Sequence, residues 1–132
     1  LKDMEIKAGL PANSSTPLAS FSSKEWTKRD RTMLFALLSA PDGCLLSRNR
    51  LCDKLFKEMK WPEPKVKVSL QKGRAVFQSD VFALDVCIDL DGEEKLADNF
   101  FDLWPGVPYS MPWLKKNPPQ VIRTGRVLIL RK

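Results

Sequence analysis

The segment Phe82-Ala83-Leu84-Asp85-Val86-Cys87-Ile88-Asp89-Leu90 carries the clearest structural pattern in this chain of 132 residues. Every second position is a large apolar residue, and alanine, aspartate or cysteine lies between them. Because successive side chains of a β-strand point to opposite faces, this period of two predicts a strand with one strongly apolar face. Asp91-Gly92 follows directly and predicts a turn.

Shorter strand patterns continue on both sides of this segment. Lys72-Gly73 predicts a hairpin turn between strands at residues 66–70 and 75–77. Residues 33–38 are apolar throughout, which is typical of a strand in the middle of a sheet, and Pro41-Asp42-Gly43 predicts a turn after them. Further strands are expected at residues 4–8, 18–22, 96–103, 121–122 and 127–130.

Residues 44–60 fit two structures. Leu51, Leu55, Phe56 and Met59 recur at helical spacing, which predicts a short amphipathic helix. The same stretch also fits a strand followed by a tight turn. Around it, eight or nine short strands are separated by turns and lack crossover helices, which predicts an all-β, antiparallel β-sandwich. The length suits one domain, residues 1–132.

The composition is that of a globular protein, with 43% hydrophobic and 29% charged residues. No apolar run approaches the ~18 residues that span a bilayer, so no membrane partner is expected. The chain contains no histidine, which excludes catalysis by a Ser-His-Asp or Cys-His arrangement. Three cysteines (Cys44, Cys52 and Cys87) form neither a disulfide framework nor a zinc motif, and Cys87 is expected to be a small buried hydrophobe.

The net charge of +6 raises the question of nucleic-acid binding. The basic residues are spread along the chain, with acidic residues mixed into several of the stretches: residues 24–31, 48–60, 65–74, 115–116 and 123–132. No zinc finger, arginine-rich helix or aromatic RNA-binding strand pair accompanies them. We therefore expect a solvated basic surface and no nucleic-acid partner.

Two sets of carboxylates are candidates for a catalytic or metal-binding role. Asp98 and Asp102 lie four residues apart, about 13 Å along a strand, whereas a retaining glycosidase needs two carboxyl groups ~5 Å apart. Asp89, Asp91, Glu93 and Glu94 surround one turn, but they match only part of a calcium-loop pattern, and a solvated hairpin tip is the preferred interpretation. The sequence thus predicts no catalytic residue, no metal site and no cofactor.

The segment at residues 96–106, Leu-Ala-Asp-Asn-Phe-Phe-Asp-Leu-Trp-Pro-Gly, is distinctive, and its residues are expected to be structural. Short Asx side chains such as those of Asp98 and Asn99 bond nearby backbone groups. Phe100 and Phe101 point to opposite faces, so one is expected in the core. Pro105 before Gly106 makes a sharp exit from a strand.

Three aromatic residues follow in or soon after this segment: Trp104, Tyr109 and Trp113. Flat rings of this kind stack on sugar faces while their polar groups stay hydrated. The competing interpretation is that they fill the edge of the sandwich or the contact with a preceding domain, and this second reading is preferred.

Taken together, several of these motifs resemble the C-terminal immunoglobulin-like domain of glycoside hydrolase family 2, in particular its β-mannosidase branch. That domain typically has a Ser-Arg-Asn strand, a proline-marked bend, an acidic turn and an Asp-Asn-aromatic-Phe-Asp-Leu run closed by Pro-Gly. The matching segments here are residues 47–49, 61–64, 66–70, 79–82 and 98–106. The likeness spans about residues 44–113, and Cys52-Asp53-Lys54 departs from it because more apolar residues are expected there.

The resemblance implies that this is an immunoglobulin-like accessory domain cut from a multidomain glycosidase whose catalytic glutamates lie in a separate barrel. Residues 44–56 would then be largely extended. The family signature would include the structural residues Asp98, Asn99, Phe100, Phe101, Asp102, Pro105 and Gly106. Its partners would be the other domains of the parent enzyme, with oligosaccharide contact through Trp104, Tyr109 and Trp113 as the alternative. The parent would hydrolyse terminal β-linked mannose or a related sugar without a cofactor, in a compartment that the sequence leaves open between periplasmic, secreted and lysosome-like.

Overall fold

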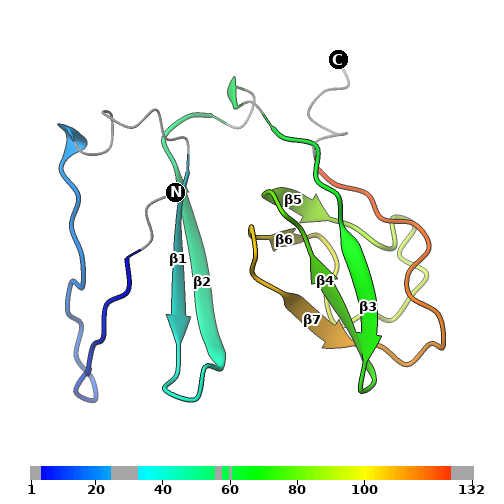
Figure 1. Ribbon diagram of the computed structural model, residues 1–132, viewed down its shortest axis with the longest axis horizontal. Helices are drawn as coiled ribbons and strands as arrows, with labels where there is room; N and C mark the ends of the chain where they lie inside the picture. The colour runs from blue at the N-terminus through cyan, green and yellow to red at the C-terminus, as the bar shows by residue number, and fades with distance from the viewer. Residues whose placement is uncertain (1–3, 25–32, 56–57, 60, 126–132) are drawn as a thin grey trace. The chain divides into compact units, whose positions relative to one another are not determined.

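The computed structural model describes residues 4–24, 33–55, 58–59 and 61–125. The chain divides into two compact units, Leu1–Phe56 and Lys57–Lys132, and each is described by itself (Figure 1). The strand expected at residues 127–130 lies outside the described residues.

The first unit contains an antiparallel ribbon of two strands, β1 (Met33–Ser39) and β2 (Leu45–Cys52). Their register pairs Met33 with Cys52 and Leu37 with Arg48. Gly43 has the positive φ of 82° that the expected turn requires. For residues 44–60, the helical interpretation is wrong over Leu45–Cys52, because cross-strand pairing with the apolar β1 determines the conformation there.

The second unit contains two antiparallel sheets. One has the order β3-β4-β7, from β3 (Lys67–Gln71), β4 (Arg74–Gln78) and β7 (Tyr109–Pro112). The other pairs β5 (Ala83–Val86) with β6 (Phe101–Leu103). The hairpin between β3 and β4 turns at Lys72 and Gly73, where φ is 47° and 74°, as the sequence predicts. The all-β class is confirmed, with seven strands in the described residues.

The core of the second unit lies between these two sheets. Ala75 and Phe77 of β4 are fully buried, as are Ala83 and Val86 of β5. The Phe77 ring meets the Phe101 ring of β6 edge-on, with centroids 4.9 Å apart. The full set of buried cluster residues is Ala75, Phe77, Ala83, Val86, Phe101, Leu103, Met111 and Trp113. Side chains from both sheets therefore form one interior, as in a β-sandwich.

The segment at residues 82–90 does not form the long alternating strand that its period of two predicts. Two residues of β5 lie between Ala83 and Val86, whereas only one residue of β6 lies between their partners Leu103 and Phe101, so β5 contains a bulge. Asp85 lies at the bulge with a positive φ of 47°.

The bulge changes which side chains of this segment are buried. Leu84 and Cys87 are each only 4% exposed, although the alternation assigns them to opposite faces. Residues 123–125 lie along the edge of this segment that β6 leaves free. Cys87 exchanges two backbone hydrogen bonds with Arg123, and the Gly125 N–H donates to the Leu84 carbonyl. The expected burial of Cys87 is confirmed.

Several other expected strands are wrong or shorter. Residues 4–8 and 18–22 form no strand and are fully on the surface. The strand expected at 96–103 is reduced to β6, and residues 121–122 give way to a single bridge between Arg123 and Cys87. A strand forms only where a neighbouring strand accepts and donates its backbone hydrogen bonds, and a pattern in one segment does not report that neighbour.

Candidate functional site

Polar side chains of the distinctive segment at residues 96–106 form hydrogen bonds with other parts of the fold. Asn99 acts as a bridge: its Oδ1 accepts the Ile88 N–H at 3.0 Å and its Nδ2 donates to the Asp89 carbonyl at 2.6 Å. A single amide therefore replaces a strand partner for two consecutive residues. The Asp98 carboxylate accepts the Tyr109 hydroxyl at 2.5 Å.

The second half of the segment secures the bulge and the exit from β6. Asp102 Oδ1 accepts the backbone N–H of Asp85 at 3.1 Å, which satisfies a donor that the bulge removes from the strand ladder. Pro105 and Gly106 form the expected turn, which is closed by a hydrogen bond of 3.0 Å from the Val107 N–H to the Trp104 carbonyl, and Gly106 has a positive φ of 72°.

The two phenylalanines of the segment point in opposite directions, as predicted. Phe101 is 3% exposed and stacks on Tyr109, with ring centroids 4.3 Å apart. Phe100 is 49% exposed and has a positive φ of 66°, which is uncommon for a bulky side chain. The backbone at this point holds one aromatic ring out on the surface.

Asp98 and Asp102 have different partners and different tasks. One accepts a phenolic hydroxyl and the other a backbone N–H of the bulge. This arrangement orients each carboxylate towards the protein itself, and neither is assigned a step in bond cleavage.

The three candidate aromatics lie mostly inside the unit. Trp104 is 3% exposed and Trp113 is 8% exposed, while Tyr109 is half-buried against Phe101. Little ring surface is therefore accessible for stacking on a sugar in the described structure, and the sugar contact stays a prediction.

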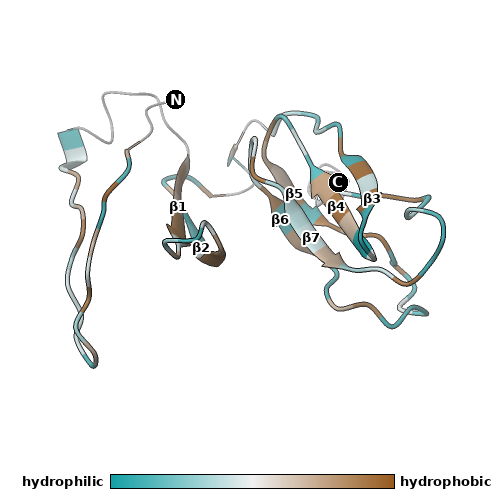
Figure 2. Ribbon diagram, turned by 60° about the horizontal axis from the view of Figure 1, so that its bottom comes forward, coloured by the Kyte–Doolittle hydropathy of each residue, from teal (hydrophilic) through white to brown (hydrophobic). Residues whose placement is uncertain are grey.

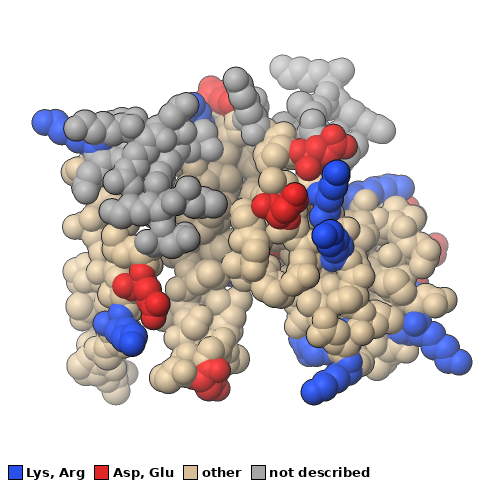
Figure 3. Space-filling model, in the orientation of Figure 1, with Lys and Arg blue, Asp and Glu red and all other residues tan. Residues whose placement is uncertain are grey.

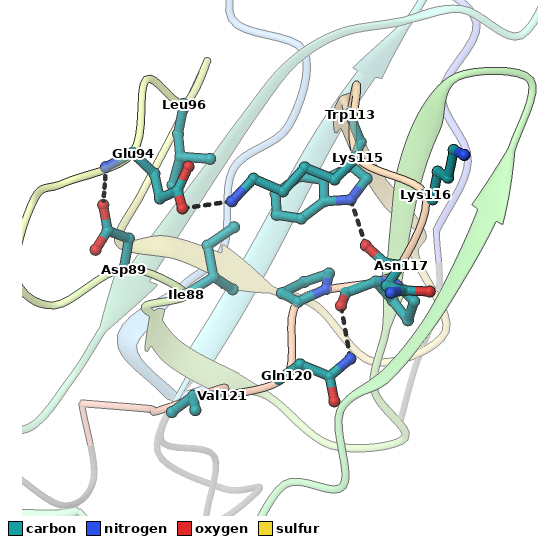
Figure 4. A pocket seen from close by; sticks show the side chains of 12 residues that line it. Ile88, Asp89, Glu94, Leu96, Trp113, Lys115, Lys116, Asn117, Gln120 and Val121 are labelled. Atoms are coloured by element: carbon teal, nitrogen blue, oxygen red, sulfur yellow. Dashed lines mark hydrogen bonds and ion pairs between the residues drawn. The ribbon is translucent and has the colours of Figure 1, made fainter.

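A pocket of about 380 Å³ lies beside Trp113 (Figure 4). The loop after Trp113 forms one wall and is held by its own hydrogen bonds, because Trp113 Nε1 donates to the Asn117 carbonyl at 2.8 Å and Gln120 Nε2 donates to the Pro118 carbonyl at 3.1 Å. The lining residues are Ile88, Asp89, Glu94, Leu96, Trp113, Lys115, Lys116, Asn117, Pro118, Pro119, Gln120 and Val121.

Charged side chains lie at the rim of this pocket. Lys115 forms an ion pair with Glu94, and its Nζ lies 5.9 Å from the centre of the Trp113 ring. Asp89 accepts two backbone N–H groups, those of Gly92 and Glu94, and so closes the acidic turn. Among the described residues, no group of three or more His, Cys, Asp or Glu side chains is arranged to hold a metal ion.

Sequence reasoning singled out Trp113 but missed the loop of residues 114–121 that makes the pocket. Pro118-Pro119 was the available signal, since two prolines exclude a strand and favour an ordered irregular loop. The course of that loop depends on contacts with residues 88–96, which are distant in sequence.

Acidic and basic residues nearly balance over residues 61–125, the long described part of the second unit. Between residues 61 and 125 there are eight Lys or Arg and nine Asp or Glu residues. Figure 3 shows lysines and arginines at several places on the visible face, with acidic side chains beside some of them. This part of the chain has a formal net charge of −1, and the absence of a nucleic-acid partner stays a prediction.

Comparison with known proteins gives no relative: no family model, no curated protein and no solved structure matches the chain. Within the described residues, no helix combines the length and the apolar character needed to cross a lipid bilayer.

Proposed function

We propose that this chain is a non-catalytic accessory domain of a larger glycoside hydrolase, of family 2 and its β-mannosidase branch. Its task is to pack against the other domains of that enzyme and to help shape the rim of the substrate cleft. The proposal starts from the resemblance of residues 98–106 to the signature of that family. The observation that supports it is that polar side chains of this segment bind other parts of the same domain. Asp98, Asn99 and Asp102 all fasten neighbouring elements of the fold.

A scaffolding role explains why this segment combines polar and aromatic residues without forming a reactive centre. Retaining glycosidases need two carboxyl groups ~5 Å apart that face one substrate bond. Here the carboxylate of Asp98 meets Tyr109 and that of Asp102 meets the bulge at Asp85. The chemistry of the enzyme is therefore assigned to a domain other than this one.

Phe100 supports the packing part of the proposal. Its ring is half-exposed and is held outward by a left-handed backbone conformation. A bulky residue rarely adopts this conformation, and such strain is found where a side chain must be presented in one direction. Contact with a neighbouring domain gives this ring an apolar environment.

The test is enzymatic and uses two proteins, the 132-residue chain and the product of the complete gene. We expect the complete product to hydrolyse an aryl β-mannoside and the 132-residue chain to show no hydrolysis. In the complete product, Phe100→Asp is expected to reduce stability or activity, whereas Leu114→Asp, at a side chain that is 99% exposed, serves as the control. A complete product without glycosidase activity, or turnover by the 132-residue chain that depends on Asp98, would refute the proposal.

Oligosaccharide titration of the 132-residue chain tests the alternative role. The accessory-domain proposal expects no saturable binding of mannooligosaccharides. Saturable binding that is lost in Trp113→Ala would replace this proposal by a carbohydrate-binding role.

A further inference from the structure

The sheet β3-β4-β7 has one face towards the core and one face towards solvent. Val68 and Leu70 of β3 point to the same side as their fully buried or core-facing partners in β4, of which Phe77 is one. Figure 2 shows the alternation of hydrophilic and hydrophobic residues along β3. The opposite side, here called the outer face, carries the hairpin residues Lys67, Ser69, Gln71, Arg74, Val76 and Gln78.

The outer face is polar and carries positive charge. In β7 it continues with Ser110 and Pro112, which pair with Val76 and Arg74. All of these positions are exposed except Val76, which is half-buried, and none is acidic or aromatic. The nearest acidic residue along β4 is Asp80, beyond the end of the strand. Since residues 61–125 have a formal net charge of −1, the positive charge of the outer face is a local feature.

Arg74 is held in one orientation on the outer face. Its Nε donates to the Ser110 hydroxyl at 3.1 Å, and its Nη2 donates to the Ser110 carbonyl at 2.8 Å. A guanidinium has five N–H groups, so three are left without a partner in the described structure. They lie on Nη1 and Nη2, whose paired N–H groups match the two oxygens of a carboxylate. Because Ser110 is neutral, these hydrogen bonds fix the guanidinium without neutralising it.

Two lysines add positive charge at the ends of the β3-β4 hairpin. Lys67 lies at the start of β3, and Lys72 lies in the turn beside Arg74. In the described structure, none of these three side chains forms an ion pair, whereas Lys115 is paired with Glu94. Arg74 pairs with Gln71, which lies about 13 Å along the strand from Lys67. The outer face therefore presents separated positive charges with hydroxyl and amide side chains between them.

This composition favours one kind of anionic partner. Single-stranded nucleic acids require aromatic side chains for base stacking, and the outer face has none. The centre of a protein interface is depleted of lysine and serine, both of which occur here. A polysaccharide with one carboxylate per sugar has separated charges and many hydroxyl groups. It complements the charges of Lys67 and Arg74 and the hydrogen-bonding groups of Ser69 and Gln71.

We propose that the outer face of the sheet β3-β4-β7 binds a linear polysaccharide that carries carboxylate groups. One carboxylate accepts the free N–H groups of Arg74, and a second pairs with Lys67 at the other end of the hairpin face. The fixed guanidinium lowers the entropy that is lost on binding. This surface is separate from the aromatic residues considered for neutral sugars, and the inference does not depend on the proposed enzyme family.

Calorimetric titration of the 132-residue chain with oligogalacturonate, a linear chain with one carboxylate per sugar, tests the inference. We expect saturable binding at ~50 mM salt that is weaker by about tenfold or more at ~1 M salt, because the contacts are exposed ion pairs. The methyl-esterified oligosaccharide keeps the backbone and loses the charges, and we expect it not to bind. Absence of saturable binding to the acidic form, or equal binding of both forms, would overturn the inference.

Three variants locate the binding surface. Arg74→Gln removes charge-assisted hydrogen bonds and is expected to weaken binding by about tenfold or more. Lys67→Gln is expected to weaken it by about threefold, as for one exposed ion pair. Lys95→Gln is the matched control, because Lys95 is exposed in the loop between β5 and β6, and it should leave binding unchanged. Equal losses for Lys67→Gln and Lys95→Gln would show a general charge effect and would overturn the assignment.

Circular dichroism of each variant separates loss of binding from loss of fold. Lys67 holds no ion pair, so Lys67→Gln keeps the test decisive even where Arg74→Gln is unstable. Tighter binding of a densely sulfated glycan or of DNA than of oligogalacturonate would assign the face to another polyanion and overturn the inference. Oligogalacturonate binding by a chain whose complete gene product hydrolyses no β-mannoside would support the inference while refuting the proposed enzyme family.

Discussion

Residues 82–90 and residues 4–8 share the same alternation of apolar and polar positions, yet they have opposite fates. Residues 82–87 of the first segment are mostly buried, with β6 on one side and residues 123–125 on the other. The second is extended, exposed and without a strand partner in the described chain. The comparison teaches that alternation encodes the capacity to form a strand, and that the available neighbour decides whether the strand forms.

The largest expected difference between the two units concerns core side chains. Phe77→Ala removes a fully buried ring that contacts Phe101, so we expect the free energy of unfolding to fall by about 3–5 kcal/mol. Leu51→Ala in β2 is the counterpart, because Leu51 is 57% exposed, and its effect should stay within about 0.5 kcal/mol. Urea unfolding followed by far-ultraviolet circular dichroism, which detects the strands of both units, measures both. Similar losses for the two variants would show that the ribbon has a core of its own.

A smaller difference is expected between two asparagines. Asn99→Ala leaves the Ile88 N–H and the Asp89 carbonyl without their partner, which should cost about 1–3 kcal/mol. Asn49 accepts only the exposed N–H of Arg50, and Asn49→Ala should change stability by less than about 0.5 kcal/mol.

The replacement Asn99→Asp sharpens this test, because it keeps an acceptor for the Ile88 N–H but sets a carboxylate oxygen against the Asp89 carbonyl oxygen. Two acceptors at this distance repel, so its loss of stability should equal or exceed that of Asn99→Ala. A smaller loss than that of the alanine variant would contradict the bridging role of the Asn99 amide.

A third comparison uses two glycines with the same backbone conformation. Gly106 and Gly43 have φ values of 72° and 82°, and an added Cβ would meet no atom within 4 Å at either. The cost of alanine is then that of the left-handed conformation alone, about 1–2 kcal/mol. We expect Gly106→Ala to lower the midpoint of the tryptophan-detected transition and Gly43→Ala to leave it unchanged. A shift in both variants would mean that the two units unfold together.

The smallest effect is expected from the ion pair between Lys115 and Glu94. Their side chains are 53% and 42% exposed, so solvent screening should limit the contribution to about 1 kcal/mol or less. A double-mutant cycle with Lys115→Met and Glu94→Gln measures this coupling energy, and ~1 M salt should remove it. A coupling that survives high salt would contradict the exposed character of the pair.

Local chemistry made part of the fold predictable. Lys72-Gly73 predicted the hairpin of β3 and β4, and Pro105-Gly106 predicted the exit from β6, because each turn depends on the backbone preferences of its own residues. The opposite directions of Phe100 and Phe101 followed from their adjacency in the sequence, whereas adjacency did not indicate which of the two lies in the core. Such features require no knowledge of distant segments.

The features that sequence reasoning missed depend on long-range pairing. The bulge at Asp85 forms together with Asp102, 17 residues away, and it disrupts the alternation of a segment that looked regular. Residues 45–52 fitted a helix or a strand by their pattern alone, and pairing of β2 with β1 decides for the strand. The pocket beside Trp113 exists because the loop after it lies against residues 88–96. In each case the deciding contact joins segments that no local pattern connects.

The three free thiols differ in accessibility, and this difference has a practical use. Cys44 is exposed at the start of β2, Cys52 is partly covered, and Cys87 is buried. A maleimide reagent should therefore modify Cys44 first in the native protein, because attack requires an accessible sulfur. A dye attached there, beside the turn of the two-stranded ribbon, gives a site-specific label that leaves the interior of the second unit untouched.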